Sequence, residues 1–228
     1  MNIAFDKEFK AGAPGFKMIL IAADVCNPPT GDALWHEIEQ AYSAIASSYP
    51  IEEIRRRPAI DATRTAYKQL GKDPNRYRPS AEALCRRAVR GLELYRTLSI
   101  IDLTNLVSLL TGHSIGAFDA DKIVGPTLTL GVGAHEEPYE AIGRGELNIE
   151  GLPVYRDAVG GIGTPTSDNE RTKLSEQTSR LVVTLNIYGD EPEYPADSLK
   201  ELFTRLLTDY ASARNITITE ISSDNENN

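Results

Sequence analysis

The spacing of apolar residues predicts helices through the first half of the chain. After the turn-rich segment CNPPTGD, apolar side chains recur in steps of three and four at Trp35, Ile38, Tyr42 and Ile45, which is the pattern of a helix that buries one face. A second helix is predicted over about residues 59–70, because Gly71 then supplies a residue type that commonly follows a helix end.

The next predicted helix carries its arginines on one side. Its start is expected at Ser80, whose hydroxyl oxygen is a common N-terminal cap. Helical spacing turns its apolar residues inward, and these are Leu84, Ala88 and Leu92. The opposite side then holds Arg86, Arg87 and Arg90. Arginines that only lay their stems over apolar surface give the same pattern, so the pattern leaves their role open.

A polar pair lies within the helix predicted over about residues 101–110. The apolar face of this helix is formed by Leu103, Leu106 and Leu110. Asp102 and Asn105 are three residues apart and share another face. Polar side chains in that position require hydrogen-bonding partners.

Short apolar runs separated by Gly, Pro and Asn predict strands in the remainder of the chain. They lie at residues 16–25, in TLTLGV and in LVVTLNIY. A last helix has an apolar stripe formed by Leu199, Leu202, Phe203, Leu206 and Tyr210, and the alternating segment NITITEI after it predicts a final strand. We therefore expect an α+β fold in which a helical N-terminal half packs on a mostly antiparallel, curved sheet.

No internal repeat or linker divides the 228 residues, so a single domain over residues 1–228 is expected. Within it we expect an N-terminal helical extension over about residues 1–75, a core over about 76–190, and a C-terminal helix and strand over 195–221. The polar sequence SSDNENN, residues 222–228, predicts a disordered tail.

The composition is typical of a soluble protein, with 41% hydrophobic residues and a mean hydropathy of -0.31. No apolar run approaches the roughly 18 residues of a membrane span, and the N-terminal sequence MNIAFDKEFKAG lacks the features of a secretory signal. Cys26 and Cys85 are far apart in such a chain, which favours reduced thiols over a disulfide. We expect a cytoplasmic protein with no membrane partner.

The net charge of -9 conceals a basic segment. From Glu52 to Arg96 the chain has twelve basic and six acidic residues, a local net charge of +6, and the remainder carries -15. A cationic face of this kind can hold phosphates while the acidic remainder limits indiscriminate nucleic-acid binding. A solvated helical face with neighbouring acids accounts for the charge equally well.

Familiar catalytic motifs are absent from the sequence, which has no GxxxxGK[ST] loop, no GxSxG elbow and no CxxC or HExxH pattern. The three histidines, His36, His113 and His135, lack the spacing of metal ligands. Neither a metal nor another cofactor is expected.

A glycine-rich stretch followed by polar residues is the remaining candidate for chemistry. Gly160, Gly161 and Gly163 leave backbone amides accessible, and they precede a polar run formed by Thr166, Ser167, Asp168, Arg171, Thr172 and Lys173. Such a segment can bind a small zwitterion. The alternative is a capping box, in which Ser167 and Glu170 satisfy the amides at a helix end, and the two interpretations are compatible.

The segment IIDLTNLVSLLTGHSIGAFDADKIVG, which begins at Ile100, resembles the signature of the B3/4 domain of phenylalanyl-tRNA synthetase beta subunits. Upstream LGKDPNRYRPSAEALCRRAV and downstream PTSDNERTKLSEQT are similar to free-standing B3/4 proteins, so the resemblance covers about residues 59–189. In the synthetase this domain is an editing module, which hydrolyses the ester between a wrong amino acid and tRNA. The resemblance implies a B3/4-like fold and a trans-acting editor.

The resemblance also assigns residues to a pocket. Asn105 matches a family position that lines the editing pocket, and the stretch 160–163 matches a pocket loop. The chain departs from the family at two positions, because Gly116 replaces a pocket histidine and Asn186 a pocket glutamate. Those side chains help to recognise tyrosine in the synthetase, so the resemblance implies a substrate other than tyrosyl-tRNA. The charged segment SDNERTK favours a more polar one.

The expected activity is hydrolysis of the ester of a mischarged aminoacyl-tRNA. Amides near Gly161 and Gly163 are expected to face the oxyanion, Asn105 to orient water or substrate, and Asp168 to assist proton transfer or bind the amine. Asp102, Gly116 and Asn186 complete the expected substrate site with Thr166, Ser167, Arg171 and Thr172.

The expected partner is the acceptor end of an aminoacylated tRNA, not DNA, with a transient association with a synthetase. Its phosphates are expected to contact Arg76, Arg78, Arg86, Arg87 and Arg90. Two alternatives stay open, a non-catalytic module that binds tRNA or an amino acid on a retired editing fold, and a protein-interaction scaffold on the same fold.

Overall fold

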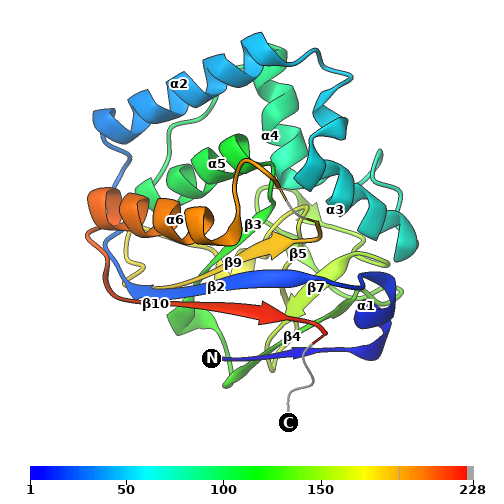
Figure 1. Ribbon diagram of the computed structural model, residues 1–228. Helices are drawn as coiled ribbons and strands as arrows, with labels where there is room; N and C mark the ends of the chain where they lie inside the picture. The colour runs from blue at the N-terminus through cyan, green and yellow to red at the C-terminus, as the bar shows by residue number, and fades with distance from the viewer. Residues whose placement is uncertain (190, 225–228) are drawn as a thin grey trace.

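The structure is a computed structural model that describes residues 1–189 and 191–224 (Figure 1). Its helices are α1 (Lys7–Gly12), α2 (Asp32–Ser48), α3 (Pro58–Gln69), α4 (Ser80–Val89), α5 (Ser99–Thr111) and α6 (Ala196–Ala211). Its strands are β1 (Asn2–Phe5), β2 (Lys17–Asp24), β3 (Ile115–Asp119), β4 (Thr127–Val132), β5 (Glu140–Ala141), β6 (Gly145–Glu146), β7 (Pro153–Arg156), β8 (Gly161–Gly163), β9 (Arg180–Ile187) and β10 (Arg214–Ser222). Short 3-10 helices are η1 (Ile54–Arg56), η2 (Ala120–Lys122) and η3 (Glu170–Thr172).

The strands form two four-stranded sheets and a small hairpin. One sheet has the order β10-β2-β9-β3 and is antiparallel throughout. The other has the order β1-β4-β7-β8, in which only the β1/β4 pair is parallel. The predicted α+β class is confirmed, although two packed sheets replace the single curved sheet that the sequence suggested.

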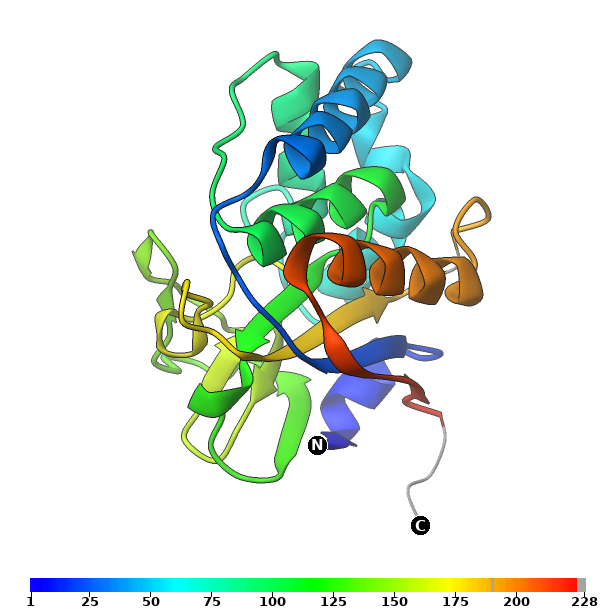
Figure 2. The ribbon, with the colours of Figure 1, turned by 90° about the vertical axis from the view of Figure 1, so that its left-hand side faces the viewer.

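Strand β2 lies at the centre of the molecule because both of its faces are apolar. Ile19 and Ile21 pack against helices, whereas Met18 and Leu20, one residue out of phase, pack against the second sheet. Alternate residues of a strand point to opposite faces, so a strand that is buried on both sides becomes a continuous apolar run. The result is three layers, with helices over one face of the β10-β2-β9-β3 sheet and the second sheet under the other (Figure 2).

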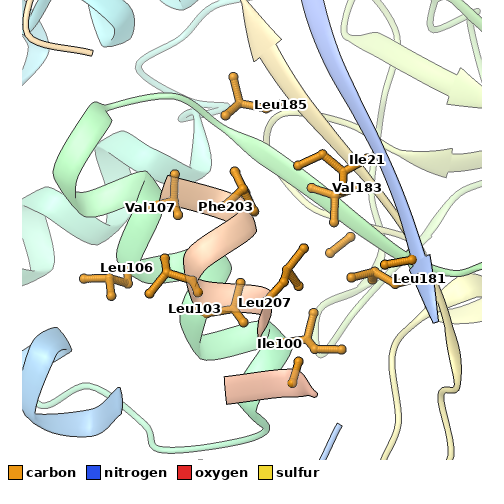
Figure 3. Packing of buried hydrophobic residues seen from close by; sticks show 14 of the residues in the cluster. Ile21, Ile100, Leu103, Leu106, Val107, Leu181, Val183, Leu185, Phe203 and Leu207 are labelled. Atoms are coloured by element: carbon orange, nitrogen blue, oxygen red, sulfur yellow. The ribbon is translucent and has the colours of Figure 1, made fainter. Parts of the chain in front are cut away.

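The larger core lies between α5, α6 and the sheet. Figure 3 shows side chains of α5 and α6 meeting those of β2 and β9, among them Phe203, Ile21 and Val183. Because α5 is fixed against the sheet in this way, the rest of its surface is available to line a site.

The chain termini are part of the sheets. Strands β1 and β2 come from the segment expected to be a helical extension, and β2 pairs with both β9 and β10. At the other end β10 continues to Ser222, and Ser223 donates its backbone amide to the Phe16 carbonyl at 2.9 Å. Of the expected disordered tail, residues 222–224 are described, and Ser222 is the last residue of β10, whereas residues 225–228 lie outside the described residues.

Helix α4 differs from its predicted form at both ends. Ser80 is the first helical residue, Pro79 occupies the cap position, and no side chain caps the helix. The helix ends at Val89, so Leu92 lies beyond it and is 46% exposed instead of facing inward. The buried side of α4 consists of Ala81, Glu82, Cys85 and Ala88.

Within the described residues, no helix is both long and apolar enough to cross a membrane.

Candidate functional site

A pocket of about 250 Å³ lies where α5 and β3 meet the segment that follows β8. Its apolar lining consists of Ile101, Ile115, Ala117, Ile142 and Leu174. Its polar lining consists of Ser80, Thr104, Asn105, Ser108, Thr164, Ser167, Asp168 and Lys173. Sites for drug-sized ligands occupy about 300–1,000 Å³, so this pocket suits a smaller group such as one amino acid.

Helix α5 supplies one side of the pocket through a single stripe of residues. Ile101, Thr104, Asn105 and Ser108 follow the i, i+3, i+4, i+7 pattern and line the pocket together. The side-chain amide of Asn105 makes no hydrogen bond within the described part of the chain, so it is available to a ligand.

Asp102 belongs to a different surface of α5. Its carboxylate is buried and accepts hydrogen bonds from the Thr30 hydroxyl at 2.5 Å and from the Thr97 amide and hydroxyl at 2.8 and 2.7 Å. It does not line the pocket. The expectation that Asp102 and Asn105 share a polar face is wrong, because Asp102 anchors the first turn of α5 to the two preceding segments.

Asp168 lies on the opposite side of the pocket, at the end of a tight turn. Gly163 and Asp168 face one another, and the turn between them is closed by a hydrogen bond from the Thr164 amide to the Ser167 carbonyl at 3.2 Å. The Asp168 carboxyl accepts a hydrogen bond from the Ala117 amide at 3.1 Å. Removal from water raises the pKa of Asp168 to about 7, against the opposing effect of that amide.

The close approach around Asp168 depends on two glycines and one phenylalanine. A Cβ at Gly163 would lie 2.5 Å from the Phe118 ring and 3.0 Å from an Asp168 carboxyl oxygen. A Cβ at Gly116 would lie 2.7 Å from the same ring. Phe118 therefore fills the space that a side chain at position 116 would need, which the sequence did not indicate.

The two positions that depart from the family pattern lie on the far face of their strands. Along β3, Ile115 and Ala117 line the pocket, so Gly116 faces the second sheet beside Phe118. Asn186 on β9 is buried, accepts a hydrogen bond from the Tyr155 hydroxyl at 2.6 Å and donates one to the Ser114 carbonyl at 2.9 Å. Neither residue lines the pocket, contrary to expectation.

The glycine-rich stretch is a strand and not a pocket loop. Gly161 and Gly163 form β8, which pairs with β7 of the second sheet. A Cβ at Gly161 would lie 2.8 Å from the Tyr139 ring, so this glycine allows close packing. Neither glycine lines the pocket, and their amides are not placed to face a ligand there.

Most of the predicted polar run is engaged within the protein. Thr166 is 3.0 Å from the Tyr67 hydroxyl, and the Thr172 hydroxyl donates to the Ile162 carbonyl at 3.4 Å. Arg171 forms a two-bonded ion pair with buried Asp157, with N to O distances of 2.8 and 2.9 Å. Only Ser167, Asp168 and Lys173 of this run line the pocket.

The capping box proposed for this segment is also corrected. Helix η3 is capped by Asn169, whose side chain accepts a hydrogen bond from the Arg171 amide. Ser167 instead donates its amide to the Thr164 hydroxyl at 3.0 Å.

The predicted RNA-binding arginines divide into two groups. Arg78 and Arg86 lie 3.5 and 3.8 Å from the buried carboxylate of Glu82, which also pairs with Arg64 at 2.7 Å. Burial, followed by the nearby charge of Arg78, lowers the pKa of Arg86.

Two arginines of the second group, Arg76 and Arg90, are exposed. Arg87 is half-buried, donates a hydrogen bond from Nε to the Glu93 carbonyl at 2.6 Å, and has its guanidinium 4.9 Å from the ring of Tyr95. Helix α4 extends from the pocket toward Arg90. Its first residue, Ser80, lines the pocket, and Arg90 follows its last turn.

Sequence reasoning missed part of the pocket lining. The signal was available for Thr104 and Ser108, which share the helical stripe of Asn105. Ser80 was interpreted as a cap, and Thr164 gave no signal because it lies in a turn whose position depends on tertiary packing.

Comparison with known proteins gives a family and a structural neighbour. The chain matches the family described as B3/4 domain over residues 62–192, more than half of its length, which confirms the resemblance identified from the sequence. A solved structure of an N-terminal fragment of the phenylalanyl-tRNA synthetase beta-subunit from Pyrococcus horikoshii is similar at 13% identity and a TM-score of 0.47, with 98% of this chain and 54% of that chain covered. The chain thus spans about half the length of that fragment. No protein of curated function matches it significantly.

Proposed function

The chain belongs to the B3/4 domain family, and from this premise we propose that it is a trans-acting editing hydrolase that cleaves the ester of a mischarged aminoacyl-tRNA. The observation that carries the proposal is Asp168, an acid with a pKa near neutrality on the wall of an amino-acid-sized pocket. Acids of this kind occur preferentially at functional sites.

Asp168 acts as the proton acceptor for the attacking water. A general base works best when its pKa lies near the operating pH, and burial gives Asp168 a pKa of about 7. Water oxygen adds to the ester carbonyl carbon as its proton passes to Asp168. The bond to the ribose oxygen then breaks, that oxygen takes the proton, and the products are a free amino acid and an uncharged tRNA.

Two donors on the pocket wall bind the carbonyl oxygen as it becomes negative. The side-chain amide of Asn105 is free of internal hydrogen bonds among the described residues, and the amine of Lys173, which pairs with Glu170, adds positive charge to the lining. Donors directed at the developing oxyanion are commonly the largest contribution to catalysis of acyl transfer. These two donors take the role that the sequence analysis expected for the amides of Gly161 and Gly163, which lie in β8.

The RNA binds along α4 and enters the pocket at the start of this helix. Arg76 and Arg90 are exposed and contact phosphates together with half-buried Arg87, whereas Arg78 and Arg86 are held partly by Glu82. Phosphate contacts position an RNA without reading its sequence, which suits an enzyme that inspects the attached amino acid.

A panel of mischarged tRNAs tests the reaction. We expect the protein to release the amino acid from at least one of them, and Asp168→Asn to lower kcat by about 100-fold or more, in line with loss of general-base catalysis. Asp209→Asn, an exposed aspartate on α6, is the matched control and should keep full activity. Release by Asp168→Asn at the native rate would remove Asp168 from the mechanism, and no release above buffer from any tRNA would reject the hydrolase.

One observation favours the alternative of a binding module without catalysis. Neither Gly116 nor Asn186 presents a side chain to the pocket, so the chain lacks the histidine and glutamate that the family resemblance places there. Saturable binding of an aminoacyl-adenosine analogue without ester cleavage would support this alternative.

A further inference from the structure

Tyr95, in the loop between α4 and α5, presents its aromatic ring to solvent. Its exposed fraction is 73%, and among the described residues, which include every Phe, Tyr and Trp of the chain, no other aromatic side chain is exposed. Its hydroxyl makes no hydrogen bond within the described part of the chain. Single exposed apolar residues are common on protein surfaces, so the surroundings of the ring decide whether it has a role.

The loop that carries Tyr95 is held in place on both sides of the ring. The preceding residue, Leu94, packs against two of the apolar clusters of the core. The following residue, Arg96, donates a hydrogen bond from Nε to the Thr30 carbonyl at 2.8 Å. The ring is therefore presented from a fixed backbone, and a ligand that contacts it does not have to order the loop first.

Arg87 on α4 holds the ring from the other side of the loop. Its Nε donates to the Glu93 carbonyl at 2.6 Å, and its guanidinium lies over the Tyr95 ring at 4.9 Å from the centroid. This distance lies within the range of a cation–π interaction, which extends to about 6 Å. The ring stays largely exposed beside this cation, so a flat ligand can stack on the surface that Arg87 leaves open.

The charges around the ring favour a ligand that carries negative charge. Arg87 and Arg90 form no ion pair within the described residues, and Arg96 pairs with Asp32 at 2.7 Å. Glu93, which is exposed and also unpaired there, supplies one opposing charge against two unpaired guanidinium groups. A nucleotide combines a flat π surface with a phosphate, and it matches both the exposed ring and the excess of positive charge.

We infer that Tyr95 is a stacking platform for an unpaired base of an RNA, and that Arg87 and Arg90 contact the phosphates next to this base. This inference rests on the proposed function, because it adds a contact to the RNA of that substrate. Every base has a π face, so stacking accepts any base, but only an unpaired base can leave its own helix to reach the ring. The site therefore distinguishes single-stranded from paired RNA, which phosphate contacts by themselves do not.

The test compares two RNA probes with equal numbers of phosphates, a single-stranded oligoadenylate and a duplex, by filter binding at several salt concentrations. We expect Tyr95→Ala to weaken binding of oligoadenylate by about 5- to 150-fold, the loss that one stacked base implies, and to leave binding of the duplex unchanged. The salt dependence of oligoadenylate binding should also stay the same, because no phosphate contact is removed.

Two further variants serve as controls. Tyr95→Phe keeps the ring and removes only the hydroxyl, so it should bind oligoadenylate as tightly as the native protein does. Val159→Ala changes an exposed apolar residue between β7 and β8 and should bind both probes normally.

Three results would reject the stacking site. The first is equal affinity of the native protein and Tyr95→Ala for oligoadenylate. The second is an equal loss for the two probes or a weaker salt dependence in Tyr95→Ala, because the substitution would then act through the arginines. The third is a native protein that binds no oligoadenylate, in which case contact with another protein becomes the explanation of the exposed ring.

Hydrolysis of mischarged tRNA separates this inference from the function on which it rests. For an ester that the native protein cleaves, we expect Tyr95→Ala to raise KM and to leave kcat unchanged, because the ring binds RNA away from the reacting atoms. An unchanged KM would reject the stacking site while the hydrolase stands. If no ester is cleaved but oligoadenylate binding depends on Tyr95, the hydrolase is rejected and the stacking site stands.

Discussion

Asp168 makes the stability of the folded protein depend on pH in an unusual direction. Its pKa is about 7 in the folded state and 3.8 for an unperturbed aspartate. Between these values the folded chain holds a proton that the unfolded chain has released, so folding becomes less favourable as pH rises from about 4 to about 7. Above that range Asp168 is ionised in both the folded and the unfolded chain, and the free energy of unfolding stays lowered by the full cost of the buried charge.

The size of this cost follows from the shift. At about 1.36 kcal/mol per pKa unit, a shift of about three units corresponds to about 4 kcal/mol. Asp168 as a whole residue is half-buried and lines the pocket, so water near the pocket screens part of its charge and we expect about 2 to 4 kcal/mol. Asp168→Asn removes the ionisation and keeps an oxygen for the Ala117 amide.

The assay is urea unfolding of both proteins, followed by the fluorescence of Trp35, the single tryptophan. At pH 8 we expect Asp168→Asn to be the more stable protein by about 2 to 4 kcal/mol, and near pH 4 the difference should disappear. Asp209→Asn should show no such trend. A difference between native protein and Asp168→Asn that stays constant from pH 4 to pH 8 would mean that the pKa of Asp168 is not raised, and the catalytic assignment would lose its basis.

The remaining predictions concern the arginines and the packed strand β3. Arg87→Glu combined with Arg90→Glu should weaken tRNA binding and reduce its salt dependence, which filter binding at several salt concentrations measures. The control, Lys7→Glu with Lys10→Glu on α1, makes the same charge change and should have little effect. Equal losses of affinity in the two variants would exclude a specific cationic face. Gly116→His should lower the free energy of unfolding by about 1 to 3 kcal/mol, because the new side chain collides with Phe118 and Thr184. Urea unfolding measures this change. A variant as stable as the native protein would show that β3 is not tightly packed.

The local pattern of apolar and polar residues predicted many of the helices and strands of this protein. Period-2 and period-3.6 patterns predicted the main helices and the strands near residues 16–25 and 181–188, because those patterns depend only on which residues need burial. The apolar stripe of α6 and the helical position of Asn105 were accessible for the same reason. The family resemblance added the identity of the domain, which composition and periodicity do not carry.

Tertiary structure alone decided which face of each element borders the pocket. Asp102 and Asn105 share a helix, but packing turns one toward Thr30 and the other into the pocket. The sequence did not predict β3, and only the structure shows that Gly116 lies beside Phe118 on one face of this strand while Ala117 on the other face lines the pocket. Partners far away in the chain create these environments, so the raised pKa of Asp168 arises only when the layers come together.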